Sequence, residues 1–235
     1  MMLPLLLLAA MQTAEPAPDT ETIVARMMQA DEARRATLER YTGMRRYRVE
    51  NRRFNKRAEM LVRCRFQRPG TKEFEIVSES GSAAVRKMAL RRMVETEREV
   101  SRHEDQRRDT QISPANYDFR YLRTEMLDGR PAFVLRATPK TQNPLLFRGA
   151  VWVDAEDYAV VRIEGSPAKK PSFWIRQVTF VHRYQKFGPY WLPVLNESKS
   201  DVRIFGHTDT VIEYFDYRIN SPDEGEALAQ PRQTQ

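Results

Sequence analysis

Hydrophobic and polar residues alternate along much of the chain, most clearly in its C-terminal part. Residues 146–220 form successive segments rich in Val, Ile, Phe, Tyr and Trp, each ended by a turn signal: LFRGAVWVD, AEDYAVVRIEG, PSFWIRQVTFVHRYQKFG, PYWLPVLNESKSDVRIFG and HTDTVIEYFDYRIN. Strands joined by such short connections run antiparallel, because a parallel crossover needs a dozen or more residues. The pattern predicts an antiparallel meander.

The N-terminal half mixes helical and strand periods. Apolar residues at helical spacing predict helices over residues 20–41 and 83–100. An alternating pattern predicts strands over residues 44–51, 59–67, 73–78, 117–126 and 131–138, and Asp128-Gly129 predicts a hairpin turn between the last two. The highly charged residues 101–109 are predicted to be a loop or a frayed helix end.

These elements predict an α+β fold that is mainly β. About ten antiparallel strands form one sheet, which at that size is expected to curl strongly. Two or more helices are then available to cover its concave face. We expect a signal peptide over residues 1–18, a single domain over residues 19–220 and a disordered tail over residues 221–235.

The net charge and the N-terminus together limit the partners. A net charge of +7 indicates attraction to nucleic acid or to an anionic membrane surface. The chain begins MMLPLLLLAA, which resembles the apolar region of a secretory signal peptide and is too short to span a bilayer. Export to the periplasm would exclude nucleic acid as a partner. Because Cys64, the only cysteine, does not follow this leader, the protein is not expected to be a lipoprotein itself.

Arginine and lysine residues gather in two places. One group lies near the first predicted hairpin and the other near the second helix: Arg45, Arg46, Arg52, Arg53, Lys56 and Arg57, then Arg86, Arg91, Arg92, Arg107 and Arg108. One interpretation is a solvated surface with compensating Glu residues. The other is docking to anionic lipid headgroups, to which each basic residue contributes about 1 kcal/mol.

Catalytic motifs are not found in the sequence. The three histidines, His103, His182 and His207, lack metal-ligand spacing, and Asp154 and Asp157 flank a turn in which Asp is favoured for its own backbone hydrogen bonds. No nucleophile motif or phosphate-binding loop is present. We therefore expect a protein that is not an enzyme and needs no cofactor or metal.

Several strands carry apolar residues on both of their faces, so the sheet must be covered on both sides or hold a ligand on one. Simple core packing is the alternative interpretation. If a ligand cavity is present, we expect it to be lined by Met60, Val62, Phe66, Phe74, Ile76, Leu135, Val151, Val153, Val161, Ile163, Val178 and Phe180 of the strands and by Met88 and Met93 of the second helix.

The chain resembles the outer-membrane lipoprotein-sorting family, the LolA/LolB-like periplasmic carriers. The resemblance lies in the order of elements, in GAVWVDAEDYAVVRIEG, and in the Gly188-Pro189 turn followed by Trp191-Leu192-Pro193. It implies an incomplete antiparallel barrel whose helices form a lid over an apolar cavity for acyl chains. It also implies a strand arginine that bonds the lid helices, for which Arg46, Arg48 and Arg63 are candidates.

The resemblance therefore predicts a soluble, monomeric periplasmic carrier. It would bind the acyl chains of a lipoprotein, or another lipid or apolar ligand, and move them towards the outer membrane. Related domains with this fold act as sensors in envelope-stress signalling, so a regulatory interaction module is the alternative.

Overall fold

The computed structural model describes residues 19–170, 175–203 and 206–221. Its helices are α1 (Thr20–Thr37), α2 (Ala83–Val85), the π-helix η1 (Arg86–Leu90), α3 (Arg91–Arg102) and α4 (Glu104–Asp109). Its strands are β1 (Arg40–Asn51), β2 (Lys56–Gln67), β3 (Thr71–Gly81), β4 (Tyr117–Leu127), β5 (Arg130–Pro139), β6 (Phe147–Asp154), β7 (Val160–Pro167), β8 (Ile175–Phe187), β9 (Tyr190–Val202) and β10 (Gly206–Ile219). The predicted leader, and the predicted tail beyond Ser221, lie outside the described residues.

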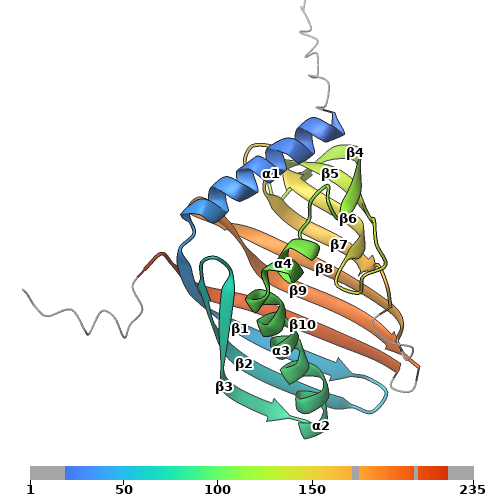
Figure 1. Ribbon diagram of the computed structural model, residues 1–235. Helices are drawn as coiled ribbons and strands as arrows, with labels where there is room; N and C mark the ends of the chain where they lie inside the picture. Colours follow the sequence, from blue (N-terminus) through green and yellow to red (C-terminus); the bar gives the residue numbers. More distant parts are fainter. Residues whose placement is uncertain (1–18, 171–174, 204–205, 222–235) are drawn as a thin grey trace, which may run out of the picture.

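The strands form one open, curved sheet in the order β3-β2-β1-β10-β9-β8-β7-β6-β5-β4 (Figure 1). Every neighbouring pair is antiparallel, and β1 pairs with β10, which joins the first hairpins to the end of the meander. The sheet does not close, because β3 and β4 remain edge strands. This confirms the predicted fold class, a mainly β chain with about ten antiparallel strands and few helices.

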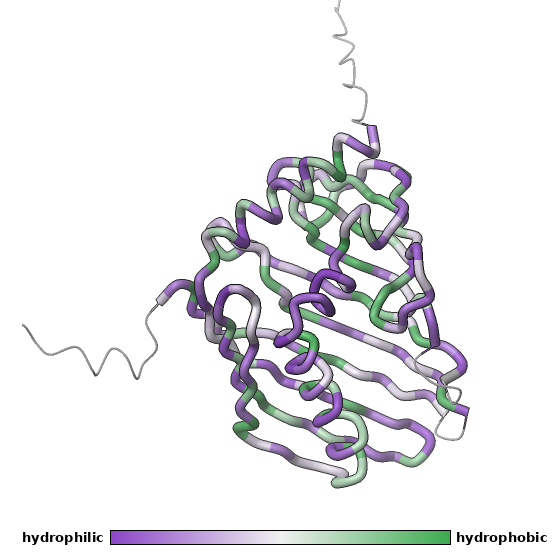
Figure 2. The backbone as a smooth tube through the Cα atoms, in the orientation of Figure 1, coloured by the Kyte–Doolittle hydropathy of each residue, from purple (hydrophilic) through white to green (hydrophobic). Residues whose placement is uncertain are grey.

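Helices cover one face of this sheet, which we call the inner face; the opposite face is the outer face. Figure 1 shows α1 across the sheet at the β4–β7 end and the α2–η1–α3 helix in front of β1, β2 and β3. Figure 2 shows that α3 and α4 are largely hydrophilic, whereas apolar residues recur along the strands. The helices thus present only a narrow apolar side to the sheet.

Helix α1 is shorter than the sequence pattern predicts. Asp19 caps its start by accepting a hydrogen bond from the backbone N–H of Thr22 at 2.8 Å. The helix ends at Thr37, whose carbonyl accepts a bond from the Asn220 side chain at 3.0 Å. Tyr41, predicted to be helical, is instead a buried residue of β1 and begins its strict inward–outward alternation. Leu38 and Tyr41 are three positions apart, a helical spacing that extended the predicted helix into the strand.

A π turn changes the face that the second helix buries. The N–H of Arg91 bonds the carbonyl of Arg86, five residues back, so this turn contains an extra residue. The side facing the sheet therefore continues from Val85 to Leu90 and Val94. Leu90 is 0% exposed and Val94 is 3% exposed. Met88, predicted to lie on the apolar stripe, is 63% exposed.

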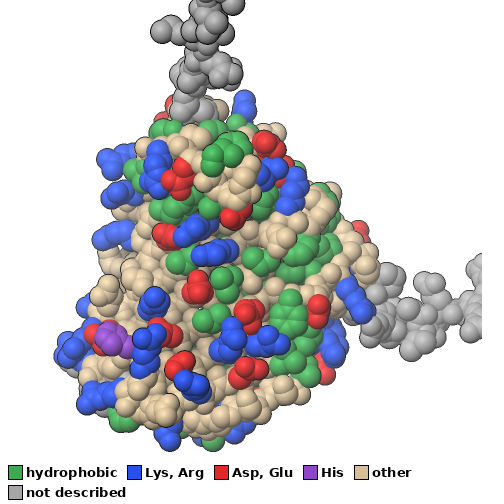
Figure 3. Space-filling view, turned by 180° about the vertical axis from the view of Figure 1, so that it is seen from behind, with side chains coloured by type: hydrophobic (Ala, Val, Ile, Leu, Met, Phe, Trp, Pro, Cys, Tyr) green, Lys and Arg blue, Asp and Glu red, His purple; other side chains and the backbone are tan. Residues whose placement is uncertain are grey.

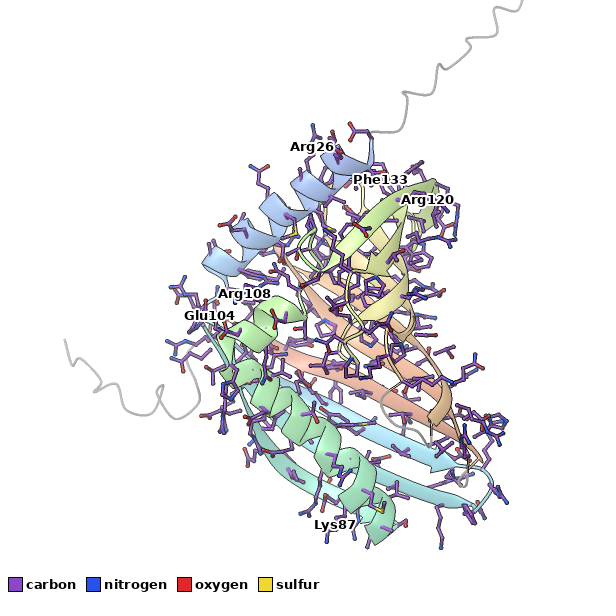
Figure 4. All side chains as sticks on the ribbon, turned by 45° about the vertical axis from the view of Figure 1, so that its right-hand side comes forward. Arg26, Lys87, Glu104, Arg108, Arg120 and Phe133 are labelled. Carbon is purple, nitrogen blue, oxygen red and sulfur yellow. The ribbon has the colours of Figure 1, made fainter. Side chains whose placement is uncertain are left out.

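Residues 101–109, predicted to be a loop or a frayed helix end, contain the short helix α4. We call the continuous α2–η1–α3 helix the long helix. Figure 4 labels Lys87 near its start and Glu104 and Arg108 on α4, beyond its other end. The side chain of Arg107 folds back and donates to the carbonyl of Ser101 at 2.6 Å. This bond ties α4 to the last turn of α3.

A β-bulge in β7 turns Val161 to the face opposite the predicted one. The register shifts where Trp152 of β6 meets Arg162 and Val153 meets Val160, so β7 holds one extra residue. Val161 consequently packs on the outer face with Trp152, whereas Ile163 packs on the inner face. The simple alternation of the sequence had placed Val161 and Ile163 on the same side.

The predicted turn residues have their expected places. Asp128 and Gly129 have φ values of 51° and 81°, as a tight hairpin turn between β4 and β5 requires. Asp154 accepts bonds from the backbone N–H groups of Glu156 and Asp157. It also receives two bonds from Arg130, at 2.6 and 2.9 Å, so this turn former is at the same time a buried ion-pair partner.

Replacing Leu90 with Ala tests the buried face of the long helix. We expect the free energy of unfolding to fall by about 2–5 kcal/mol, since the change leaves a cavity beneath the π turn. Met88→Ala, two residues away on the exposed side, should change it by less than about 0.5 kcal/mol. Chemical denaturation of both variants gives the comparison, and equal losses would contradict this assignment of the faces.

Candidate functional site: the helix-covered inner face

One cross-strand row on the inner face runs across all ten strands. From β4 to β3 its members are Tyr121, Leu135, Val151, Ile163, His182, Asn196, Ile212, Tyr47, Met60 and Glu79. Apolar and aromatic residues occupy both sides of the row apart from Glu79 at its β3 end, and two polar residues, His182 and Asn196, occupy its middle. The inner face is therefore divided into two apolar areas by a polar belt on β8 and β9.

Helix α1 covers the first apolar area. Ile23, Val24 and Met27 of α1 pack against strands β4 to β7 in one buried cluster. In Figure 4, Arg26 of α1 and Phe133 of β5 mark this end of the molecule. The predicted cavity residues that belong to this area are Leu135, Val151, Val153 and Ile163, with Phe180 packed against them.

The long helix covers the second apolar area. Leu90 and Val94 pack against Tyr47, Val49 and Ile212 and against two predicted cavity residues, Met60 and Val62. The predicted residues Phe74 and Met93 border this cluster, and Phe66 belongs to a neighbouring one with Tyr41 and Cys64.

The remaining predicted cavity residues are less enclosed. Val178 is partly buried and shares the inward-facing side of β8 with Phe180. Ile76 lies opposite Val62 but on the edge strand β3, where it is 40% exposed. With Val161 on the outer face and Met88 in solvent, the structure does not bring all predicted residues together.

The polar belt separates the two apolar areas. His182 pairs with Asn196 across β8 and β9, and Ser198 and Thr210 lie beside them on the same face. Burial lowers the pKa of His182 to about 4, which its hydrogen bond with Asn196 only partly opposes. The imidazole is therefore neutral near pH 7, and the belt carries hydrogen-bonding groups rather than charge.

A buried ion cluster holds the long helix to the sheet. Arg45 of β1 is 3% exposed and donates to the Glu97 carboxylate of α3 at 2.5 Å and to the Tyr47 hydroxyl at 3.3 Å. Lys72 of β3 donates to the other Glu97 oxygen at 2.7 Å. We call Arg45, Lys72 and Glu97 the latch, because they connect two strands to one helix.

Aromatic rings and charges complete the latch. The Arg45 guanidinium lies between the rings of Phe74 and Tyr214, 5.0 Å from each centroid. Burial by itself would raise the pKa of Glu97, but Lys72 and Arg45 lower it to about 2. Burial acts to lower the pKa of Lys72 and of Arg45, yet Glu97 raises both above their ordinary values. All three groups are thus charged at neutral pH.

The sequence resemblance implied such an arginine but did not identify it. The candidates Arg46, Arg48 and Arg63 all point to the outer face, where they pair with Glu213 or Glu75. Arg45 was instead one of the basic residues near the first hairpin, which were expected on a solvated or a lipid-docking surface. Its signal was its place in the inward row with Tyr47, where the alternation puts apolar residues.

The other basic groups mostly meet carboxylates. Arg52 pairs with Asp209, Arg57 with Glu50, and both Arg86 and Arg91 with Glu79. These pairs agree with the interpretation of a solvated surface with compensating acidic residues.

Space beneath the helices is limited. Met60, Val62, Leu135, Val151 and Val153 are 0% exposed, so the protein's own side chains fill the inner face around them. A pocket of about 220 Å³ lies beside α1 and is lined on one side by Met27, Met28 and Arg34 and on the other by Val160, Tyr184 and Trp191. This is smaller than the roughly 300–1,000 Å³ of common ligand sites.

Reactive groups are not assembled at this face. The described residues contain no group of three or more His, Cys, Asp or Glu side chains placed to hold a metal ion. Cys64 is 1% exposed, and burial raises the pKa of its thiol. A protonated, enclosed thiol is a poor nucleophile.

Comparison with known proteins gives a family assignment. A family model described as "Uncharacterized protein" matches residues 100–225, more than half of the 235-residue chain. The chain belongs to this family. No curated protein matches the sequence.

Solved structures resemble this chain at low sequence identity. A domain assigned as an outer membrane lipoprotein-sorting protein from Vibrio parahaemolyticus is 13% identical, with 85% of this chain and 94% of that one covered and a TM-score of 0.44. A LolA superfamily protein from Nitrosomonas europaea is 13% identical over 89% and 97% of the two chains, with a TM-score of 0.41. The MucA/MucB complex of Pseudomonas aeruginosa matches at 10% identity over 86% and 99%, with a TM-score of 0.26.

The structures found include the lipoprotein-sorting and LolA-superfamily proteins that the sequence resemblance predicted. Among the described residues, no helix combines the length and the apolar character needed to cross a membrane.

Removing the latch arginine should loosen the long helix. We expect Arg45→Met to lower the free energy of unfolding by about 3 kcal/mol, because Glu97 would lose its most buried partner. Arg46→Met is the matched control: that arginine is 42% exposed on the outer face, and its loss should cost at most about 1 kcal/mol. Denaturant titrations of the two variants test this, and similar losses would contradict a special role for Arg45.

The latch should also make stability depend on pH. The pKa of Glu97 in the folded protein, about 2, lies below its ordinary value of 4.5. Ionised Glu97 therefore stabilises the fold above about pH 5, and this contribution is lost as the pH falls towards about 2. The stability difference between the wild type and Glu97→Gln should shrink between about pH 5 and about pH 2. A difference that does not change with pH would show that the carboxylate is not stabilised by its neighbours.

Proposed function

We propose that the protein is a periplasmic, non-enzymatic binding protein that takes up an acyl chain or another apolar ligand on the inner face of its sheet. The observation that carries the proposal is the second apolar area, which is covered by a helix with few buried apolar side chains and one ion latch. When this helix moves away, Met60, Val62 and their neighbours become available to a ligand.

The energies of helix and ligand are comparable. Leu90 and Val94 are the apolar side chains that the long helix buries almost fully, and each contributes about 1.5–3 kcal/mol. A buried methylene group contributes roughly 0.8 kcal/mol. About four to eight methylenes of an acyl chain would therefore offset the apolar contacts of the helix, and a fatty acyl chain contains more than that.

Two further features support a carrier in the periplasm. The chain begins with a leader-like apolar segment, and its sequence resembles the lipoprotein-sorting carriers. The acyl chains of a lipoprotein, carried towards the outer membrane, are accordingly the cargo we propose. Such a carrier would work as a monomer and without a cofactor.

A regulatory interaction module is the second candidate. The observation that favours it is the complete burial of Met60, Val62, Leu135 and Val151 by the protein's own helices. In that case the inner face would be core, and the protein would act by binding another protein, for example in envelope-stress signalling.

Uptake of the neutral fluorescent probe N-phenyl-naphthylamine separates the two candidates. The carrier should bind it with an increase in fluorescence, and a folded Ile212→Glu variant should lose the signal, because Ile212 belongs to the second apolar area with Met60 and Val62. Val211→Glu is the matched control, since Val211 precedes Ile212 on β10 and lies opposite Arg48 on the outer face. Probe affinity of this variant should stay within about twofold of the wild type, a difference below roughly 0.5 kcal/mol.

Each result of this experiment has a definite meaning. Equal effects of Ile212→Glu and Val211→Glu would contradict binding on the inner face. If the folded wild type takes up no probe, and native mass spectrometry of protein purified from a periplasmic extract shows no bound lipid, the carrier function is wrong and the interaction module is favoured.

A further inference from the structure

The outer face of the sheet, away from the helices, holds a groove of about 690 Å³ over strands β4 to β9. This volume lies within the range of small-molecule sites, roughly 300–1,000 Å³. Gly149 and Gly165 lie opposite each other under it, and a Cβ atom on either would collide with the backbone of the other strand. The two strand backbones thus approach each other too closely at this point for side chains on Gly149 and Gly165.

Basic side chains without partners surround this groove. Arg136, Arg148 and Lys199 line it, and no ion pair or side-chain hydrogen bond involves any of them within the described part of the chain. Arg136 also lies directly opposite Arg120 on β4, and like charges in such a position destabilise a sheet unless an anion lies near them. Figure 3 views the molecule from the side opposite the helices and so shows the outer face, with basic and acidic side chains scattered among uncharged ones.

Acidic side chains compensate only part of this charge. Of the two glutamates that line the groove, Glu164 accepts a hydrogen bond from Arg162, which in turn lies over the ring of Trp152. Glu197 alone is left to face three cations. The groove is therefore electropositive and suited to an anion.

The register indicates the shape of that anion. Arg148 pairs with Ser166 on β7, and Lys199 pairs with Thr179 on β8. Ser166 and Thr179 follow the Gly165–Phe180 pair, so the four residues form one row across β6 to β9. Neighbouring strands lie about 4.8 Å apart, so the backbone positions of Arg148 and Lys199 at the two ends of the row are roughly 14 Å apart. The hydroxyl groups of Ser166 and Thr179 lie between them.

We propose that this groove binds a molecule that carries two phosphate groups, one held near Arg148 and Arg136 and the other near Lys199. The planar guanidinium fork matches the oxygens of a phosphate, and Lys binds phosphate as a point charge. The hydroxyl groups of Ser166 and Thr179 can donate hydrogen bonds to the part of the ligand between its two phosphate groups. The site lies on the opposite face from the proposed apolar site and does not depend on it.

Calorimetric titration with fructose bisphosphate and fructose monophosphate tests the proposal. The bisphosphate should bind at least about tenfold more tightly, and Arg148→Gln and Lys199→Gln should each weaken it about tenfold through loss of a charged hydrogen bond. Arg183→Gln is the matched control, since Arg183 is an exposed arginine of β8 outside the groove. All three changes are on the surface, and thermal unfolding would confirm that each variant is folded.

Flotation with phosphatidylcholine vesicles, with and without cardiolipin, identifies the source of the phosphates. Binding to cardiolipin vesicles but not to the sugar phosphate, lost in Arg148→Gln and Lys199→Gln, would support the site and assign it to a lipid headgroup. Binding to neither probe, or equal weakening by Arg183→Gln, would overturn the proposal. Uptake of N-phenyl-naphthylamine should be unchanged in these variants, so the failure of this proposal is distinguishable from failure of the apolar site.

Discussion

The arrangement of sheet and helices depends on one buried charge. Arg45 points from β1 into the interior with 3% of its surface exposed, and Glu97 of α3 meets it there. Removing a guanidinium from water costs several kcal/mol unless its bonds are replaced, which Glu97, the Tyr47 hydroxyl and two aromatic rings do. The helix can therefore sit in only one register on the sheet, because any shift would leave the guanidinium buried without a partner.

This dependence is a matter of specificity more than of strength. A buried ion pair is often no more stabilising than apolar residues of the same volume. An apolar contact in place of Arg45 and Glu97 would hold the helix in several positions and would exclude water permanently. An ion pair with Glu97 one third exposed fixes one closed position and still allows separation, since each charge is hydrated once the helix leaves.

Much of the fold follows from the alternation of residue types, but two features do not. The strand segments, the hairpin at Asp128-Gly129 and the inward row of Met60, Val62 and Cys64 agree with the sequence pattern. The π turn at Arg86–Leu90 and the bulge at Val161 each insert a single residue, and a periodic pattern carries no mark of the place where its phase changes. Met88 and Val161 were misplaced for this one reason.

The candidate site was harder to predict, because its decisive residues do not look like members of a core. Residue type alone places Arg45 and Glu97 on the surface, and burial of a charge is recognised only when its partner, fifty-two positions away in the sequence, is known. The groove on the outer face is equally hidden, since its cations lie on three strands that the register brings into neighbouring rows.

The polar belt of His182 and Asn196 has a consequence for motion. It separates the cluster under α1 from the cluster under the long helix, and the two share no buried residue. Local opening costs less than global unfolding when few buried contacts are lost. Release of the long helix would expose Met60 and Val62 while α1 keeps its own cluster closed and the strand ladder keeps its hydrogen bonds. The sheet then remains a rigid support, and the latch, together with the contacts of Leu90 and Val94, keeps the second apolar area covered.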